Sequence, residues 1–389
     1  MIPLTLTGTA HKSSPRGKKI VLSKNYNTDD YSIEISSSIK GSNKIMVHEA
    51  ASYYPILKSS PIPDRSISQV LSDFPFITQK DHSTLLIRRG NWNIDSWLVI
   101  PRNFKLIIQE GTFLSFTSSV GIISKGRVVI NGTTDNPVVL SGSDLENGKG
   151  LWQGIVILDT NEPSVWSNVF IKGTTGVNIE GWNLTAGTTF YQADVTLNNV
   201  TFSGNHCEDT LNIVRSNFEL NEVNISNALS DGFDFDFSKG VVTNGTFENI
   251  GLIGGGDAID ASGSFAKITG AKFKNIGDKA ISAGENSVVT GAQLFIKGVM
   301  AGVVSKDGSH ISLEDTTIRG FKIASMMAYI KKSEFGSATI EASHIKTDGI
   351  PDSVIAENGS QILIDGIEVP GRVVDVKSLY ATTMKPALK

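Results

Sequence analysis

The segment SDGFDFDFSKG, residues 230–240, holds the residues in this sequence whose types and spacing could do chemistry. Asp234 and Asp236 alternate with phenylalanines, which predicts a strand with one apolar face and one acidic face. Lys239 is the only basic residue in the segment. Crowded carboxylates can bind a cation such as Ca²⁺, hold a proton through a raised pKa, or accept hydrogen bonds from sugar hydroxyls. The choice among these depends on what lies beside the strand.

The surrounding sequence repeats with a period of about 22 residues, so the neighbours of this strand can be predicted. The steps from Asp209 to Asp231, from Asp257 to Lys279 and from Lys279 to Ala301 are each 22 residues. The step from Asp231 to Asp257 is 26 residues, which we attribute to an insertion around GLIGGG, residues 251–256. A unit this short cannot bury its own apolar side and must stack on its neighbours, which predicts a solenoid of β-coils.

Composition supports an all-β fold and narrows the class of partner. Short runs of Val, Ile, Thr and Phe are separated by turn residues, and 38 of the 389 residues are glycine. The net charge of −4 argues against a nucleic-acid partner. No apolar run approaches the roughly 20 residues of a membrane helix, so we expect no transmembrane segment. The one cysteine, Cys207, excludes an intrachain disulfide.

In a parallel solenoid, equivalent residues of successive coils lie about 4.8 Å apart, so the period predicts columns of side chains. One column contains Asp209, Asp231, Asp257 and Lys279, and a second contains Asn212, Asp234, Asp260 and Ser282, with Asp236 beside Ser262 and Gly284. We expect catalytic roles for Asp234, Asp260, Asp257 and Lys279. We expect substrate binding by Asp209, Asp231, Asp236 and Lys306. If a Ca²⁺ ion is bound, the expected ligands are Asp231, Asp234, Asp257 and Asp260.

A simpler interpretation of some of these aspartates is turn chemistry. Asp is common in turns because its side chain accepts hydrogen bonds from nearby backbone amides, and Asp231 and Asp257 each adjoin a glycine. Asp234, Asp236 and Asp260 are different, because they are expected inside strands, where Asp is disfavoured. For these three a ligand-facing role is the preferred interpretation.

The repeat, together with the segment WLVIPRNFKLIIQEGTFLSF, the NPV turn and the strand GLWQGIVIL, resembles the right-handed parallel β-helix proteins of the pectate-lyase-like superfamily. The resemblance covers residues 85–370 and implies a single-stranded parallel β-helix and a polysaccharide partner. The aspartate-bearing coils also resemble β-helix regions associated with spore-coat-protein-H-like proteins of bacterial envelopes. That resemblance implies a cell-envelope or exopolysaccharide setting and no particular reaction.

The sequence is compatible with several reactions on a polysaccharide. The motifs DGFDFDF and GDAIDAS resemble the coils of polygalacturonase-type β-helices, but the third motif, Gly277-Asp278-Lys279, has no histidine and no Arg-x-Lys follows. A lyase, a glycoside hydrolase and a uronate epimerase therefore all stay as hypotheses. The rival hypothesis is a non-catalytic structural or adhesive module of a surface protein or phage tail. A homo-oligomer is compatible with either.

We divide the chain into residues 1–80, which form an N-terminal extension or cap or a fragment of a preceding small β domain, the β-helix (85–375) and a tail (376–389). Within the extension, PIPDRSISQVLSDF predicts a short helix that begins near Ser66 or Ser68. No signal peptide is visible, so the expected extracellular, periplasmic or cell-surface location requires another export route or a longer product. Several aromatic residues could stack on sugars, although most are expected to pack within the coils: Trp92, Trp97, Trp152, Trp166, Trp182, Phe190 and Tyr191.

Overall fold

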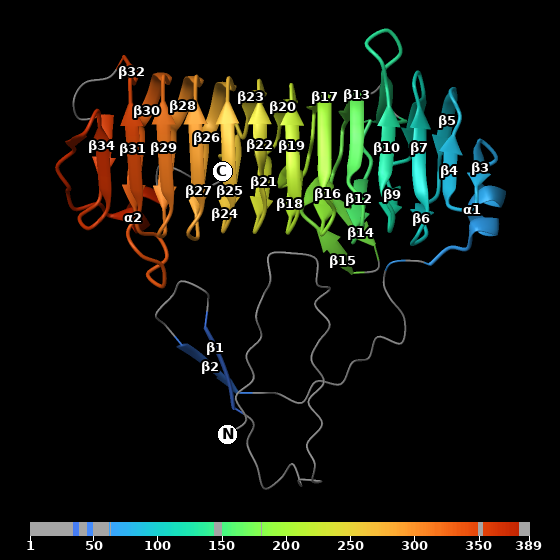
Figure 1. Ribbon diagram of the computed structural model, residues 1–389, viewed down its shortest axis with the longest axis horizontal. Coiled ribbons are helices and arrows are strands. Elements are labelled where there is room, and N and C mark those ends of the chain that lie inside the picture. Colours follow the sequence, from blue (N-terminus) through green and yellow to red (C-terminus); the bar gives the residue numbers. More distant parts are fainter. Residues whose placement is uncertain are drawn as a thin grey trace, which may run out of the picture.

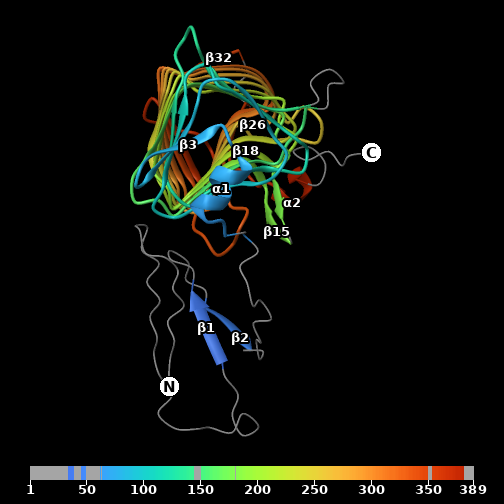
Figure 2. The same ribbon diagram turned by 90° about the vertical axis from the view of Figure 1, so that its right-hand side faces the viewer.

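A computed structural model describes residues 34–38, 45–49, 62, 64–143, 150–179, 181–348 and 353–380 of the chain. Its main body is a parallel β-solenoid of about 12 turns. Figure 1 shows the coils stacked side by side along the long axis in sequence order, from blue to red. The end-on view in Figure 2 shows the strands arranged around a common interior. The all-β parallel β-helix predicted from the 22-residue period is confirmed.

Each coil contributes strands to three parallel sheets, which we call sheets I, II and III. Sheet I contains β6 (Leu98–Ile100), β9 (Gly121–Ser124), β12 (Gly154–Leu158), β16 (Ala186–Tyr191), β18 (Asp209–Val214), β21 (Asp231–Asp236), β24 (Ile259–Ser262), the second halves of β26 (Lys272–Gly284), β28 (Phe295–Lys306) and β30 (Thr317–Tyr329), and β33 (Val354–Ala356). Sheet I is the sheet that carries the candidate site.

Sheets II and III complete each coil. Sheet II contains β4 (Thr84–Ile87), β7 (Lys105–Gln109), β10 (Val128–Asn131), the first halves of β13 (Ser164–Lys172) and β17 (Val195–Ser203), β19 (Asn217–Asn221), β22 (Lys239–Thr243), β25 (Phe265–Thr269), β27 (Val288–Ala292), β29 (His310–Glu314), β31 (Thr339–Ser343) and β34 (Gln361–Ile364). Sheet III contains β5 (Asn91–Ile94), β8 (Phe113–Phe116), β11 (Val138–Gly142), the second halves of β13 and β17, β20 (Asn224–Ala228), β23 (Thr246–Ile250), the first halves of β26, β28 and β30, and β32 (Lys346–Thr347).

The inward side chains of the three sheets form one continuous apolar core. Phe233 and Phe235 of β21 are fully buried and stack with ring centroids 4.9 Å apart. In sheet III, Phe247 of the same coil stacks on Phe273 of the next coil at 5.1 Å. Burial of each such ring contributes about 2–3 kcal/mol, so the core fixes which face of every strand points outward.

A ladder of buried serines holds the corner between sheets I and II, and sequence reasoning missed it. The backbone N–H of Ser216 donates to Ser238 Oγ, that of Ser238 to Ser264 Oγ, and that of Ser264 to Ser287 Oγ, at 2.9–3.1 Å. Ser287 continues the pattern to Ser309. The ladder satisfies amides that would otherwise be buried without partners, and it keeps successive corners in the same conformation.

The described N-terminal elements cover the first coil. Helix α1 (Ile67–Asp73) begins after Ser66, whose hydroxyl accepts from Gln69 N–H, so the predicted helix start at Ser66 is confirmed. Val70 of α1 is fully buried in the core. Strand β3 (Ile77–Asp81) then pairs antiparallel with β4. The rest of the 1–80 extension, apart from the antiparallel pair β1 (Glu34–Ser38) and β2 (Ile45–Glu49), lies outside the described residues.

Three smaller elements depart from the coils. The antiparallel hairpin of β14 (Val177–Ile179) and β15 (Trp182–Leu184) projects between β13 and β16, and β35 (Ile367–Glu368) pairs with β34. Helix α2 (Val376–Leu379) follows the last coil. Among the residues that the structure describes, neither helix has the length and apolar character to cross a membrane.

Candidate functional site

The alternating segment of aspartates and phenylalanines within residues 230–240 forms β21 in sheet I. Phe233 and Phe235 point into the core, whereas Asp234 and Asp236 point outward and remain partly exposed. Burial of the two rings therefore forces both carboxyl groups onto the outer face of sheet I. The predicted division of this strand into an apolar and an acidic face is confirmed.

Strand register gathers the predicted aspartates on that outer face. Asp209 pairs with Asp231, and Asn212, Asp234, Asp260 and Ser282 follow one another across β18, β21, β24 and β26. Asp236, Ser262 and Gly284 form the neighbouring column. These columns are the ones predicted from the period. We call the following residues the acidic cluster: Asp209, Asp231, Asp234, Asp236, Asp257, Asp260 and Asp278.

Part of the acidic cluster makes backbone contacts of the kind expected in turns. Asp231 Oδ1 accepts from Asp257 N–H at 2.8 Å, and Asp257 Oδ1 accepts from Lys279 N–H at 3.0 Å. Asp234 and Asp260 differ. Asp234 accepts from the Asn212 side chain at 3.1 Å, and Asp260 pairs with a lysine at 3.5 Å. In the described part of the chain, neither of these two carboxylates accepts from a backbone amide.

Burial and mutual repulsion keep several of these carboxyl groups protonated to unusually high pH. Burial raises the pKa of Asp231 to about 8, and the nearby Asp257 carboxylate adds to the shift. Burial, with Asp236 next in effect, raises the pKa of Asp234 well above its ordinary value. Burial raises the pKa of Asp209 to about 6 against a hydrogen bond from Thr185. At neutral pH the cluster therefore holds protons that it can donate.

Two buried lysines supply the positive charge that the segment 230–240 lacks. Lys279 Nζ lies 3.1 Å from Asp257 Oδ1 and 2.6 Å from Asp278 Oδ2. Lys306 Nζ lies 3.5 Å from Asp260 Oδ1. Although burial opposes the charged forms, the adjacent carboxylates raise the pKa of both lysines. Both ammonium groups therefore stay protonated and serve as counter-ions within the site.

The lysines reverse the protonation preference of one aspartate. Burial alone would raise the pKa of Asp260, but the ammonium groups of Lys306 and Lys279 lower it below its ordinary value. Asp234, one coil away in the same column, is shifted in the opposite direction. The pKa values of two neighbouring carboxyls are thus shifted in opposite directions, which favours the protonated form of Asp234 and the ionised form of Asp260.

The C-terminal segment covers the lysine end of the acidic cluster. A second, smaller apolar cluster on the outer face of sheet I contains Val304, Met327 and Tyr329, and Leu379 and Tyr380 pack against it. The Tyr380 and Tyr329 hydroxyls are 2.7 Å apart. The Tyr380 ring lies 5.6 Å from Lys279 Nζ, and Lys279 is only 2% exposed. In this arrangement Lys279 cannot touch a substrate, and the predicted catalytic role would require Tyr380 to move.

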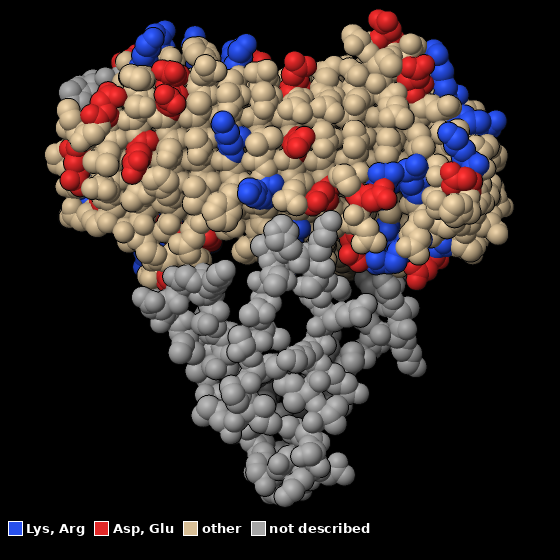
Figure 3. All heavy atoms as spheres, viewed as in Figure 1, with Lys and Arg blue, Asp and Glu red and all other residues tan. Residues whose placement is uncertain are grey.

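The other end of the acidic cluster adjoins the β14–β15 hairpin. Thr185, which follows β15, donates to Asp209 Oδ2 at 2.7 Å. In Figure 2, β15 and α2 lie on the same side of the solenoid, and Figure 1 shows them separated along its axis. The acidic cluster therefore occupies a stretch of sheet I with a projecting element near each end. On the face turned to the viewer in Figure 3, charged residues of both signs are spread over a surface that is mostly uncharged.

Sequence reasoning identified most of the acidic cluster and missed several of its partners. Asp278 was given no role in the sequence analysis, yet it is buried and paired with Lys279. Its position in the motif GDK, one period after GDA, was the available signal. Tyr380 and Thr185 carried no signal, because neither lies in the repeating pattern.

The residues proposed as Ca²⁺ ligands are close together, but two of them already have cationic partners. Asp257 pairs with Lys279 and Asp260 with Lys306, while Asp231 and Asp234 have no lysine partner among the described residues. A cation bound by all four carboxylates would have to compete with both ammonium groups. The calcium site thus stays a prediction, and the ion pairs favour lysine as the counter-ion.

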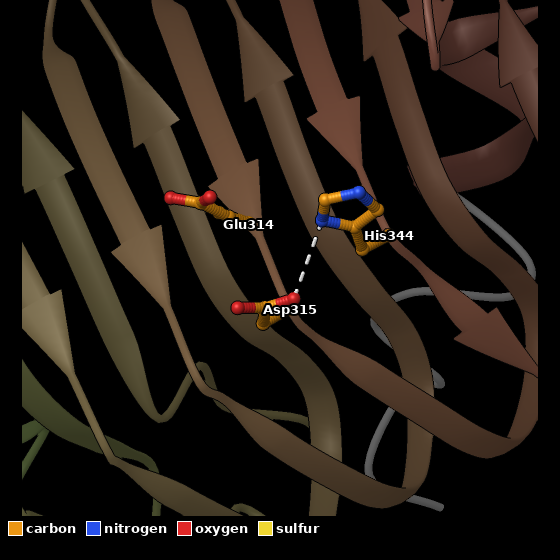
Figure 4. A group of neighbouring side chains, drawn as sticks. All are labelled: Glu314, Asp315 and His344. Atoms are coloured by element: carbon orange, nitrogen blue, oxygen red, sulfur yellow. Dashed lines mark ion pairs between the residues drawn. The ribbon is translucent and has the colours of Figure 1, made fainter.

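A second group of potential metal ligands lies away from sheet I. Figure 4 shows Glu314, Asp315 and His344 at the ends of β29 and β31, with His344 Nδ1 3.4 Å from Asp315 Oδ1. The His344 and Asp315 side chains are 71% and 56% exposed. Exposed groups of this kind gain little from one another in water.

The aromatic residues suggested for sugar stacking are mostly core residues. Trp152, Trp166 and Phe190 are fully buried, and Trp92 and Trp97 pack against the core. Trp152 stacks on Phe116 with centroids 4.1 Å apart. The expectation that most of them pack within the coils is confirmed.

No protein-family model matches the chain, and the search of curated proteins found no match. Among solved structures, it is similar to an alginate lyase from Paenibacillus sp., at 12% identity and a TM-score of 0.42, over 72% of this chain and 94% of that one. It is also similar to a tailspike of an Acinetobacter phage, at 11% identity and a TM-score of 0.40. That similarity covers 73% of this chain and 60% of the tailspike chain. The chain is similar to the Agl-KA catalytic domain at 14% identity and a TM-score of 0.48. That similarity covers 82% of this chain and 71% of the Agl-KA chain. Similarities this low concern the fold and leave substrate and reaction to be argued from the site.

Proposed function

We propose that this protein binds a polysaccharide on the outer face of sheet I and hydrolyses it with Asp234 and Asp260. The observation that carries the proposal is the placement of these two carboxyls side by side in one outward column with different partners, the Asn212 amide for Asp234 and the Lys306 ammonium for Asp260. The opposite directions of their pKa shifts agree with that difference. Glycoside hydrolysis needs one protonated carboxyl as general acid and one ionised carboxylate as base or nucleophile. Environments that drive the pKa values of two neighbouring groups apart supply that pair.

The role of each residue follows from its surroundings. Asp234, whose pKa is raised by burial, would hold the proton and donate it to the glycosidic oxygen. Asp260, whose charge Lys306 stabilises, would act as base or nucleophile, and its side chain is 24% exposed. A lyase or epimerase would instead need a group that removes a sugar C–H proton. The buried lysines are poor candidates for that role, because their raised pKa values keep them protonated.

The charge of the acidic cluster favours a neutral glycan over a uronate-rich one. Seven carboxyl groups face two ammonium groups, so even a partly protonated cluster is negative or neutral. A uronate carboxylate brought beside it would be repelled. Sugar hydroxyls, by contrast, can donate to the ionised carboxylates and accept from the protonated ones.

Turn-like contacts of the acidic cluster support a second candidate, the non-catalytic surface or phage-tail module. Asp231 and Asp257 each accept from a backbone amide, as a purely structural ladder would require. Asp234 and Asp260 do not, and that difference favours the hydrolase. The cell-envelope or exopolysaccharide setting, an exported location and a homo-oligomer remain proposals that accompany either candidate.

A glycan panel with two variants tests the function. Neutral glucans, galactans and mannans, polygalacturonate and alginate would be incubated with the protein, with Ca²⁺ or with chelator. Reducing ends, absorbance near 235 nm and binding would be followed together. We expect new reducing ends from a neutral glycan that disappear in Asp234→Asn and Asp260→Asn, while Glu219→Gln, an exposed carboxyl on β19, stays active. Absorbance near 235 nm would instead indicate a lyase. Failure of every glycan to bind would support the structural module.

A further inference from the structure

Phe237 occupies a backbone conformation that a phenylalanine rarely adopts. It follows β21 at the corner between sheets I and II, with φ of +50°. The equivalent residues of neighbouring coils, Arg215, Gly263, Glu285 and Asp307, also have positive φ. Glycine and short polar residues tolerate this left-handed region, whereas a bulky apolar side chain there costs free energy.

Core packing does not explain the presence of this side chain. Phe237 is 53% exposed, whereas Phe233 and Phe235 of the same strand are fully buried. The ring lies against Gly263 of the next coil, where a Cβ atom would come within 2.8 Å of Phe237 Cδ1. Gly263 therefore leaves space for the ring to lie along the surface. The Arg215 guanidinium carbon lies 5.6 Å from the ring centroid.

The ring adjoins the acidic cluster. Phe237 directly follows Asp236, whose carboxyl belongs to the outward column of sheet I. Because the corners of neighbouring coils share the positive φ, the corner sets this conformation, and the choice of phenylalanine there is what needs an explanation. A half-exposed aromatic ring beside hydrogen-bonding carboxylates is the combination that recognises a sugar, because one face of a pyranose ring presents C–H groups and its rim presents hydroxyls.

We propose that one pyranose unit of the bound glycan stacks on the Phe237 ring. The hydroxyls of that pyranose unit would then be directed to Asp236 and Asp234. This inference rests on the proposed function and adds the requirement that the glycan contain a pyranose with an exposed C–H face. The glycan then lies along the outer face of sheet I and ends at the corner that follows β21, so it does not extend onto sheet II. The ring contributes binding, and the chemistry stays with the carboxyl pair.

Three variants separate stacking from structure. Phe237→Gly removes the ring and relieves the left-handed strain, Phe237→Trp restores an aromatic face, and Phe265→Ala removes an equally exposed phenylalanine, 54% exposed, from β25 of sheet II. The probe is an array of neutral glucan, galactan and mannan oligosaccharides with uronate oligosaccharides beside them. Melting temperature is recorded for each variant.

We expect Phe237→Gly to weaken binding about ten-fold or more, Phe237→Trp to recover it, and Phe265→Ala to leave it unchanged. The melting temperature of Phe237→Gly should stay the same or rise. A marked fall in that temperature would show that the ring is structural and overturn the inference. So would equal losses in Phe237→Gly and Phe265→Ala, or a Phe237→Gly variant that binds normally while Asp234→Asn does not. If the wild type binds no oligosaccharide, the proposed function and this inference fail together.

Discussion

Replacing Asp231 with asparagine should make the protein more stable at neutral pH. The Asp231 carboxyl is partly buried beside Asp257, and its pKa is raised to about 8. Its Oδ1 accepts from Asp257 N–H at 2.8 Å, a contact that an amide oxygen can also make. Asp231→Asn therefore keeps the shape and the backbone contact, and it removes only the ability to ionise.

The expected gain follows from proton linkage. Because the pKa of Asp231 is raised on folding, its contribution to stability is complete below the unfolded value of 3.8 and is lost as pH rises towards about 8. Each pH unit in that interval corresponds to about 1.36 kcal/mol, which gives about 4 kcal/mol at pH 7. Neighbouring carboxyls titrate together with Asp231, so we expect roughly 2 kcal/mol of this to be recovered by the substitution.

Urea unfolding of wild type and Asp231→Asn at pH 4.5, 7 and 8 measures the difference in the free energy of unfolding. We expect the advantage of the variant to be small at pH 4.5 and to grow with pH. Glu219→Gln is the matched control, because this exposed carboxyl should change stability by less than about 0.5 kcal/mol at every pH. A variant less stable than the wild type at pH 8, or a difference independent of pH, would refute the reasoning.

Two further outcomes test the lysine end of the site. Lys306→Met should destabilise the protein by about 3 kcal/mol in urea unfolding, because it leaves the Asp260 carboxylate without its ion-pair partner, and unchanged stability would contradict this role. Tyr380→Ala should destabilise the protein by about 2 kcal/mol in urea unfolding, because the Tyr380 ring packs on the buried Tyr329 and lies against Lys279. Unchanged stability would show that Tyr380 does not cover this end of the site.

Much of the candidate site could be predicted because solenoid neighbours are fixed by sequence spacing. Steps of 22 residues place Asp209 beside Asp231, and the alternation with phenylalanine sends Asp234 outward. The 26-residue step to Asp257 was also assigned correctly to an insertion, since residues 251–254 form a turn between β23 and β24. In each case a local pattern is enough, because every coil packs on the coil one period away.

Contacts that lie outside the period could be found only in the tertiary structure. Tyr380 meets Tyr329 across 51 residues of sequence, and no repeat relates the two. The burial of the aromatic residues proposed for sugar stacking could not be predicted either. The sequence does not distinguish the buried Trp152 from the exposed Phe237.

The sequence by itself determined the β-helix, the register of its coils and the outward column that contains Asp234 and Asp260. The tertiary structure decided that the pKa values of these two carboxyls shift in opposite directions. Chain spacing sets which residues are neighbours in a solenoid, whereas a pKa depends on burial and on every charge nearby. The charge that separates the pair belongs to Lys306, which lies two coils beyond Asp260 along the solenoid.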